Sequence, residues 1–270
     1  MAAVTVLVVD GLAVQRFVPQ GGSAAPPIVM VHGAMDRASG LRRAVRHLDG
    51  IDVTTFDRRG YAGSLGSGIA ETMSDQVDDL FAVMDSVTSG PVVLIGHSLG
   101  GLIALHASLR GPDRIAGVGA WEPPMPWFDW YVSDAAQNVR GLSDIATPSD
   151  AAETFMRAMI GDRLWERLPS AMREERRAEG ATLRADLAMT RSVESVLDLT
   201  TVTAALVAGC GSESSSRFRL SAARLLADVP HAEYFEVAGA GHGAHLSHPV
   251  DFAAFVRTTH SRAPHRPAPP

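Results

Sequence analysis

Short apolar runs alternate with helical patterns along most of the chain, and this alternation limits the possible folds more than any other feature. A hairpin is expected over residues 4–18, turned at Asp10-Gly11. Further strands are predicted over residues 28–31, 51–56, 91–96, 115–120, 202–208 and 232–237. Helical spacing predicts helices between them, over residues 37–48, 72–87, 218–227 and 250–258. Strands joined through helices run parallel with right-handed crossovers, so we expect a mostly parallel sheet of eight strands with helices on both faces.

The alternation stops between residues 122 and 200. Helical patterns cover residues 150–160, 163–178 and 181–190, with no strand pattern among them. We therefore expect a core domain formed by residues 1–121 and 201–260, and a helical cap formed by residues 122–200 and inserted after the sixth strand. The tail, residues 261–270, is rich in proline, arginine and alanine and is expected to be disordered.

The composition excludes several classes of partner. A net charge of −6 leaves no basic surface for nucleic acid, and the single cysteine, Cys210, excludes an intrachain disulfide. No run approaches the roughly 20 apolar residues that a membrane helix needs. We expect a cytoplasmic protein without nucleic-acid or membrane partners. The sequence does not indicate an oligomeric state.

A serine flanked by glycines lies where one predicted strand turns into a helix. The sequence Gly96-His97-Ser98-Leu99-Gly100 is a G-x-S-x-G motif between an apolar strand and an apolar helix. A serine on so sharp a turn takes a strained backbone, and glycines two positions away on each side avoid collisions. The turn exposes the Ser98 hydroxyl, and the start of the helix directs the N–H of Leu99 toward a developing negative oxygen. The motif predicts a nucleophilic serine, with Leu99 as an oxyanion-hole donor.

With these residues the sequence resembles the α/β-hydrolase superfamily, over about residues 4 to 258. The segment Val31-His32-Gly33-Ala34 matches the family's His-Gly turn after the third strand. This match implies that the N–H of Ala34 is the second oxyanion-hole donor. Residues 57–64 resemble the family's D-x-R-G-x-G-x-S loop with one extra residue, for which we expect a structural role only.

A histidine loop follows the last predicted strand. The sequence Gly239-Ala240-Gly241-His242-Gly243 matches the catalytic histidine loop of the family, which implies that His242 is the base that deprotonates Ser98. His245 and His248 follow at intervals of three residues, but no carboxylate or cysteine cluster accompanies them, so we predict no metal site. The chain carries no cofactor-binding motif, and we expect no cofactor.

The position of the catalytic acid departs from the common family pattern. Most members place it after the seventh strand in a G-x-x-D pattern, but Ser212 occupies that position here. Glu213 follows one residue later, and Glu122 lies just past the sixth predicted strand, where some members place their acid. Pro123 and Pro124 would fix the backbone at Glu122. We predict Glu122 as the acid, with Glu213, or a serine–histidine pair without an acid, as the alternatives.

Aromatic residues gather at the entrance to the predicted cap. They can form an apolar pocket wall or join the cap to the core, and both roles can hold together. The predicted pocket residues are His32, His97, Trp121, Trp127 and Phe128. They suggest a small-molecule substrate with an apolar part.

Three functional hypotheses follow from these residues. The first is a serine hydrolase that acts on an ester-type carbonyl through an acyl-enzyme. The second is a ligand-binding or receptor-like protein with little turnover, which the departure at Ser212 supports. The third is haloperoxidase-like or acyl-transfer chemistry on the same three residues.

Overall fold

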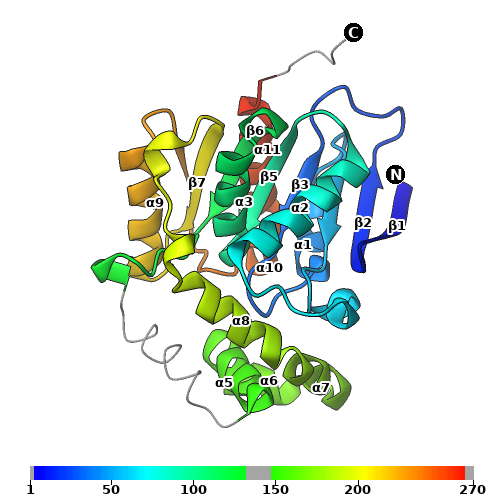
Figure 1. The fold of residues 1–270 in the computed structure, drawn as a ribbon, viewed down its shortest axis with the longest axis vertical. Helices are drawn as coiled ribbons and strands as arrows, with labels where there is room; N and C mark the ends of the chain where they lie inside the picture. The colour runs from blue at the N-terminus through cyan, green and yellow to red at the C-terminus, as the bar shows by residue number, and fades with distance from the viewer. Residues whose placement is uncertain (1–2, 132–146, 265–270) are drawn as a thin grey trace.

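The computed structural model describes residues 3–131 and 147–264, and its centre is one eight-stranded sheet (Figure 1). The strand order is β1-β2-β4-β3-β5-β6-β7-β8. The strands are β1 (Ala3–Val9), β2 (Leu12–Val18), β3 (Ile28–Val31), β4 (Val53–Phe56), β5 (Val92–His97), β6 (Ile115–Trp121), β7 (Ala205–Gly211) and β8 (Glu233–Val237). β2 pairs antiparallel with β1 and β4, and every other pair is parallel. The predicted mostly parallel sheet of eight strands is confirmed.

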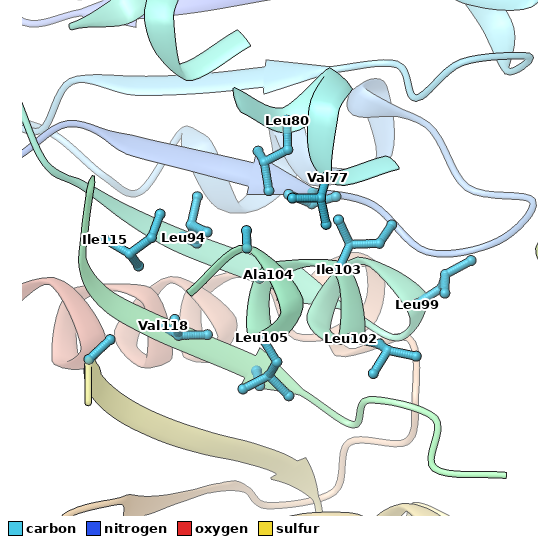
Figure 2. Packing of buried hydrophobic residues seen from close by; sticks show 14 of the residues in the cluster. Val77, Leu80, Leu94, Leu99, Leu102, Ile103, Ala104, Leu105, Ile115 and Val118 are labelled. Carbon is cyan, nitrogen blue, oxygen red and sulfur yellow. The ribbon is translucent and has the colours of Figure 1, made fainter. Parts of the chain in front are cut away.

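Helices cover both faces of the sheet, as predicted. One face packs against α2 (Met73–Val87), α3 (Leu99–Arg110) and α9 (Ser216–Asp228), and the other against α1 (Ala38–Val45) and α11 (Pro249–Arg262). Figure 2 shows Ile103 of α3 next to Val77 of α2, and both belong to the same apolar cluster. Along β5, Leu94 packs toward α3, whereas Val93 and Ile95 pack on the opposite face. Burial of both faces explains why the parallel strands are continuous apolar runs.

Local chemistry accounts for two differences between predicted and observed boundaries. Thr72 is the N-cap of α2 rather than its first residue, because its hydroxyl accepts the Asp75 N–H in a capping box. The helix predicted over residues 163–178 is two helices, α6 (Asp162–Arg167) and α7 (Ser170–Ala178). Pro169 disfavours helical backbone at Leu168, which is extended with ψ 141°.

Between β6 and β7 the described residues form helices joined by irregular segments, with no strand among them. These helices include α5 (Pro148–Ile160), α6, α7 and α8 (Gly180–Thr190), which lie together beside the sheet in Figure 1. Their apolar residues form a separate cluster that includes Phe155, Trp165 and Leu183. Met35 and Tyr61, from the loops after β3 and β4, complete this cluster. We call α5–α8 the cap, and it contacts the core through those two loops.

The ends of the chain modify one prediction. The tail predicted as disordered begins inside α11, because Ser261 and Arg262 are helical and Ala263 is buried. Residues 265–270 lie outside the described residues. Among the helices of residues 3–131 and 147–264, none is both long and apolar enough to cross a membrane. The cytoplasmic location stays a prediction.

A buried ion pair joins the cap to the loop after β4. Arg58 donates to both carboxylate oxygens of Asp186 on α8, at 3.1 and 2.7 Å, and both side chains are 1% exposed. The same guanidinium donates to the backbone carbonyls of His32 and Gly33. The loop containing residues 57–64 therefore has the structural role that the sequence predicted.

We expect Asp186→Ala to lower the free energy of unfolding by about 3–5 kcal/mol, because it leaves the Arg58 charge buried without its partner. Urea unfolding followed by circular dichroism measures this loss. The matched control is Asp78→Ala, since Asp78 pairs with Arg110 on the surface and its loss should cost less than about 1 kcal/mol. Equal losses in the two variants would contradict the role of the buried pair.

Candidate active site

Ser98 lies at the turn from β5 into α3 with a strained backbone. Its φ and ψ are 54° and −123°, a region that residues with a side chain rarely adopt. Its N–H donates to the Trp121 carbonyl at 2.8 Å, and its carbonyl accepts from the N–H of Gly101 at 2.8 Å. The side chain is partly exposed, although both neighbouring residues are buried. The turn therefore presents the hydroxyl at the carboxyl end of β5.

Glycines make this turn possible. A Cβ on Gly96 would lie 2.2 Å from the Gly100 carbonyl oxygen, and one on Gly100 would lie 2.1 Å from the Val31 carbonyl oxygen. Real Cβ atoms do not approach so closely, so the collisions predicted for these two positions are confirmed. Gly33, in the turn after β3, is also tight, because a Cβ there would lie 3.0 Å from the Cβ of Ser98.

His242 bonds to Glu122 and not to Glu213. The Nδ1–H of His242 donates to Glu122 Oε2 at 2.6 Å, and Glu122 is fully buried. The other carboxylate oxygen, Oε1, accepts the Gly211 N–H at 2.8 Å. Burial alone would raise the pKa of Glu122, but the hydrogen bond and charge of His242 and the Gly211 amide bring it below its ordinary value. Glu122 is therefore ionised, and Glu213 is exposed on the following loop.

The His242 loop is attached to the ends of β5 and β6. The carbonyl of His242 accepts the Nε2–H of His97 at 2.9 Å and the indole N–H of Trp121 at 3.1 Å. His97 immediately precedes Ser98, and the rings of His97 and His242 are 4.7 Å apart. These contacts bring the imidazole of His242 to the strand end that carries Ser98.

The two residues expected to supply the oxyanion-hole amides, Leu99 and Ala34, come from α3 and from the loop after β3. Leu99 is the first residue of α3, where the helix leaves its N–H groups without intrahelical partners. Ala34 follows Gly33, where an added Cβ would lie 3.0 Å from the Cβ of Ser98. The Arg58 guanidinium donates both to the Gly33 carbonyl and to Asp186 of the cap helix α8. The cap therefore also supports the turn after β3.

Three of the predicted pocket residues are part of the core instead. Trp121 is fully buried, and its ring packs against Phe252 and Phe255 of α11. His32 is fully buried too, and its ring nitrogens bond to the Gly33 carbonyl and the Arg58 N–H. Burial, which is the largest cause, and the charge of Arg58 lower the pKa of His32 to about 3, so the ring is neutral. His97 is also buried, beneath the His242 loop. These positions correct the prediction that the three residues line a pocket.

Trp127 and Phe128 remain partly accessible and belong to a row of aromatic rings. The row runs from Trp127 through Phe128, Trp130 and Tyr131 to Phe218 of α9. The ring of Phe218 stacks on the ring of His242, with centroids 4.0 Å apart and planes 5° apart. Trp127 also lines a cavity of about 620 Å³ with Pro126 and residues between 190 and 196.

Sequence reasoning missed Phe218 and Gly211 as partners of the site. Phe218 belongs to a predicted helix, but nothing in a helical pattern indicates which side chain stacks on a distant loop. Gly211 lies at the end of β7, next to β6 in the sheet, and its amide fixes Oε1 of Glu122. The register pairs Trp121 with Gly209, so a correct end for β7 would have placed Glu122 opposite Cys210 and one residue from Gly211.

A sequence model of the alpha/beta hydrolase family matches residues 28–255, and the chain belongs to this family. One curated relative is the lipase LipV of Mycobacterium tuberculosis, 28% identical over 145 residues, which cover 54% of each chain. Another is the uncharacterized carboxylesterase nap of Bacillus subtilis, 27% identical over 154 residues, or 54% of this chain and 48% of the relative. The chain thus spans about half the length of these relatives.

Solved structures share the whole fold. The enol-lactonase from Burkholderia xenovorans superposes with a TM-score of 0.71 over 95% of this chain and 100% of its own, at 17% identity. The naproxen esterase from Bacillus subtilis gives a TM-score of 0.64 over 96% of this chain and 91% of its own, at 18% identity. Sequence identities of 17% and 18% support a shared fold but do not indicate the substrate, which has to be inferred from the site.

Proposed function

We propose that this chain is a serine hydrolase that cleaves an ester-type carbonyl of a small substrate with an apolar part. The observation that carries the proposal is the 2.6 Å contact between His242 Nδ1 and the buried Glu122, beside the strained turn that presents Ser98. An ionised carboxylate on Nδ1 keeps the proton there and leaves Nε2 free to accept a proton. Relatives named lipase and carboxylesterase support ester hydrolysis.

In the proposed reaction, His242 Nε2 takes the Ser98 hydroxyl proton while the serine oxygen bonds to the substrate carbonyl carbon. The N–H groups of Leu99 and Ala34 stabilise the oxyanion of the tetrahedral intermediate. The protonated imidazole, stabilised by Glu122, then gives its proton to the departing alcohol oxygen, which leaves an acyl group on Ser98. Water, deprotonated by His242, attacks the acyl-enzyme and releases the carboxylic acid.

The aromatic row suggests where the apolar part of the substrate binds. It begins at Phe218, which stacks on His242, and leads to Trp127 at the edge of the cavity. An apolar chain that follows this row would bury its surface on aromatic carbon, which stabilises binding by roughly 25 cal/mol per Å². We therefore propose hydrolysis of esters with apolar acyl or alcohol groups.

Covalent labelling tests this proposal. We expect a fluorophosphonate probe to label the protein once, at Ser98, and the labelled protein to lose hydrolysis of p-nitrophenyl butyrate in proportion to labelling. Intact mass spectrometry and peptide mapping measure the labelling and its position, and the release of p-nitrophenol measures the remaining activity. A serine that never labels, in a protein that does not hydrolyse p-nitrophenyl esters, would instead favour the ligand-binding hypothesis.

A further inference from the structure

A second cluster of ionisable side chains lies beside the His242 loop and takes no part in the proposed reaction. It consists of Asp36 from the loop after β3, His97 from the end of β5 and His245 from α10 (Ala244–Ser247). One ligand atom from each of the three lies within 4.8 Å of the others, and the rings of His97 and His245 are 4.2 Å apart. Three separate segments of the chain therefore meet at one point.

Four polar atoms of this cluster are buried without a hydrogen bond. His97 is 6% exposed and His245 is 2% exposed. Asp36 Oδ2, His97 Nδ1 and both ring nitrogens of His245 lack a hydrogen bond, although His245 Nε2 lies 3.0 Å from Asp36 Oδ2. Buried polar atoms without partners are costly, so this concentration of them indicates a missing ligand.

The geometry points to a binding site for a divalent transition-metal ion, such as Zn²⁺, formed by Asp36, His97 and His245. Two imidazoles and one carboxylate are a common ligand set for such ions. The ion would contact His97 through Nδ1 and Asp36 through Oδ2, the atoms without hydrogen bonds.

The surroundings match those of a metal site. A ligating histidine ordinarily donates its other ring N–H to a carbonyl, and His97 Nε2–H donates to the His242 carbonyl. Ligating carboxylates are hydrogen-bonded as well, and Asp36 Oδ1 accepts the Arg37 N–H at 2.8 Å.

A bound ion would join the loop after β3 to the loop that carries His242. Asp36 lies two residues after Ala34, and His97 holds the His242 carbonyl. The ion would thereby fix both the proposed oxyanion-hole turn and the proposed base. The sequence pattern of His242, His245 and His248 did not indicate this site, because only His245 belongs to it and its partners come from distant segments.

Metal titration of the untagged full chain tests the site. After removal of metals with EDTA, isothermal titration calorimetry with ZnCl₂ should show one bound ion, and Co²⁺ should give a visible absorption band typical of a coordinated ion. We expect His245→Ala and Asp36→Asn to weaken Zn²⁺ binding by about 100-fold or more, since outer partners alone contribute about 10–100-fold. Zn²⁺ should also raise the melting temperature of the original protein but not of these two variants.

The matched control is His248→Ala, which removes a histidine three residues further along the chain, just before α11, and should bind Zn²⁺ as the original protein does. Circular dichroism of the metal-free variants establishes that they are folded. Absence of stoichiometric Zn²⁺ binding, or undiminished binding by folded His245→Ala, would overturn the site and leave a simple Asp36–His245 ion pair. Ester hydrolysis by the metal-free protein is measured separately, so failure of one proposal is distinguishable from failure of the other.

Discussion

Ser98→Ala is expected to lower kcat for p-nitrophenyl ester hydrolysis by about 10⁶-fold, because no other group would form the acyl-enzyme. The fold should persist, since the contacts that hold the turn are the backbone hydrogen bonds of Ser98 to Trp121 and Gly101. Initial rates at saturating ester, with the melting temperature as the check on folding, measure the two effects.

Ser247→Ala is the matched control for this substitution. Ser247 is an exposed serine on α10, close in sequence to His242, and its loss should leave kcat within about twofold of the original value. If folded Ser98→Ala kept a substantial fraction of the original rate, Ser98 would not be the nucleophile. If the two variants are purified identically and only Ser98→Ala loses its ester hydrolysis, a contaminating esterase does not account for the measured rate.

The sheet and the serine turn could be predicted because they depend on local sequence. Apolar runs buried on both faces define the parallel strands, and Gly96 and Gly100 are required by backbone contacts only 2.1–2.2 Å from their missing Cβ atoms. Glu122 was also the predicted acid, and it is the carboxylate that contacts His242. Pairing of β6 with β7 places Glu122 beside Gly211, whose amide holds it.

The residues that line the pocket were harder to predict, because successive side chains of a strand point to opposite faces of the sheet. Val118 and Ala120 face α3, so alternation along β6 turns Trp121 toward α11, where Phe252 and Phe255 bury it. Applying that alternation to the sequence would have corrected the prediction for Trp121. No such local rule places Phe218 on His242, since that contact joins α9 to the loop after β8.

Glu122→Gln is expected to lower kcat by about 10⁴-fold while the fold is retained. The reason lies in the two oxygens of Glu122. Oε1 accepts the Gly211 N–H, so the glutamine carbonyl would keep that position and its NH₂ would face Nδ1 of His242. Nδ1 must then accept a hydrogen bond, which moves the ring proton to Nε2 and removes the base that Ser98 needs. Steady-state rates and the ¹⁵N chemical shifts of the His242 ring measure the lost rate and the changed tautomer.

Glu213→Gln is the matched control, because it makes the same change of charge on the exposed loop after β7 and should leave both the rate and the tautomer unaltered. A large loss of rate in Glu213→Gln with little loss in Glu122→Gln would make Glu213 the acid, although in this structure His242 Nδ1 bonds to Glu122. Full activity in both variants would leave Ser98 and His242 as a pair without an acid. A tautomer change in Glu122→Gln together with the loss of rate would instead attribute the loss to the position of one proton, since the two side chains have nearly the same shape.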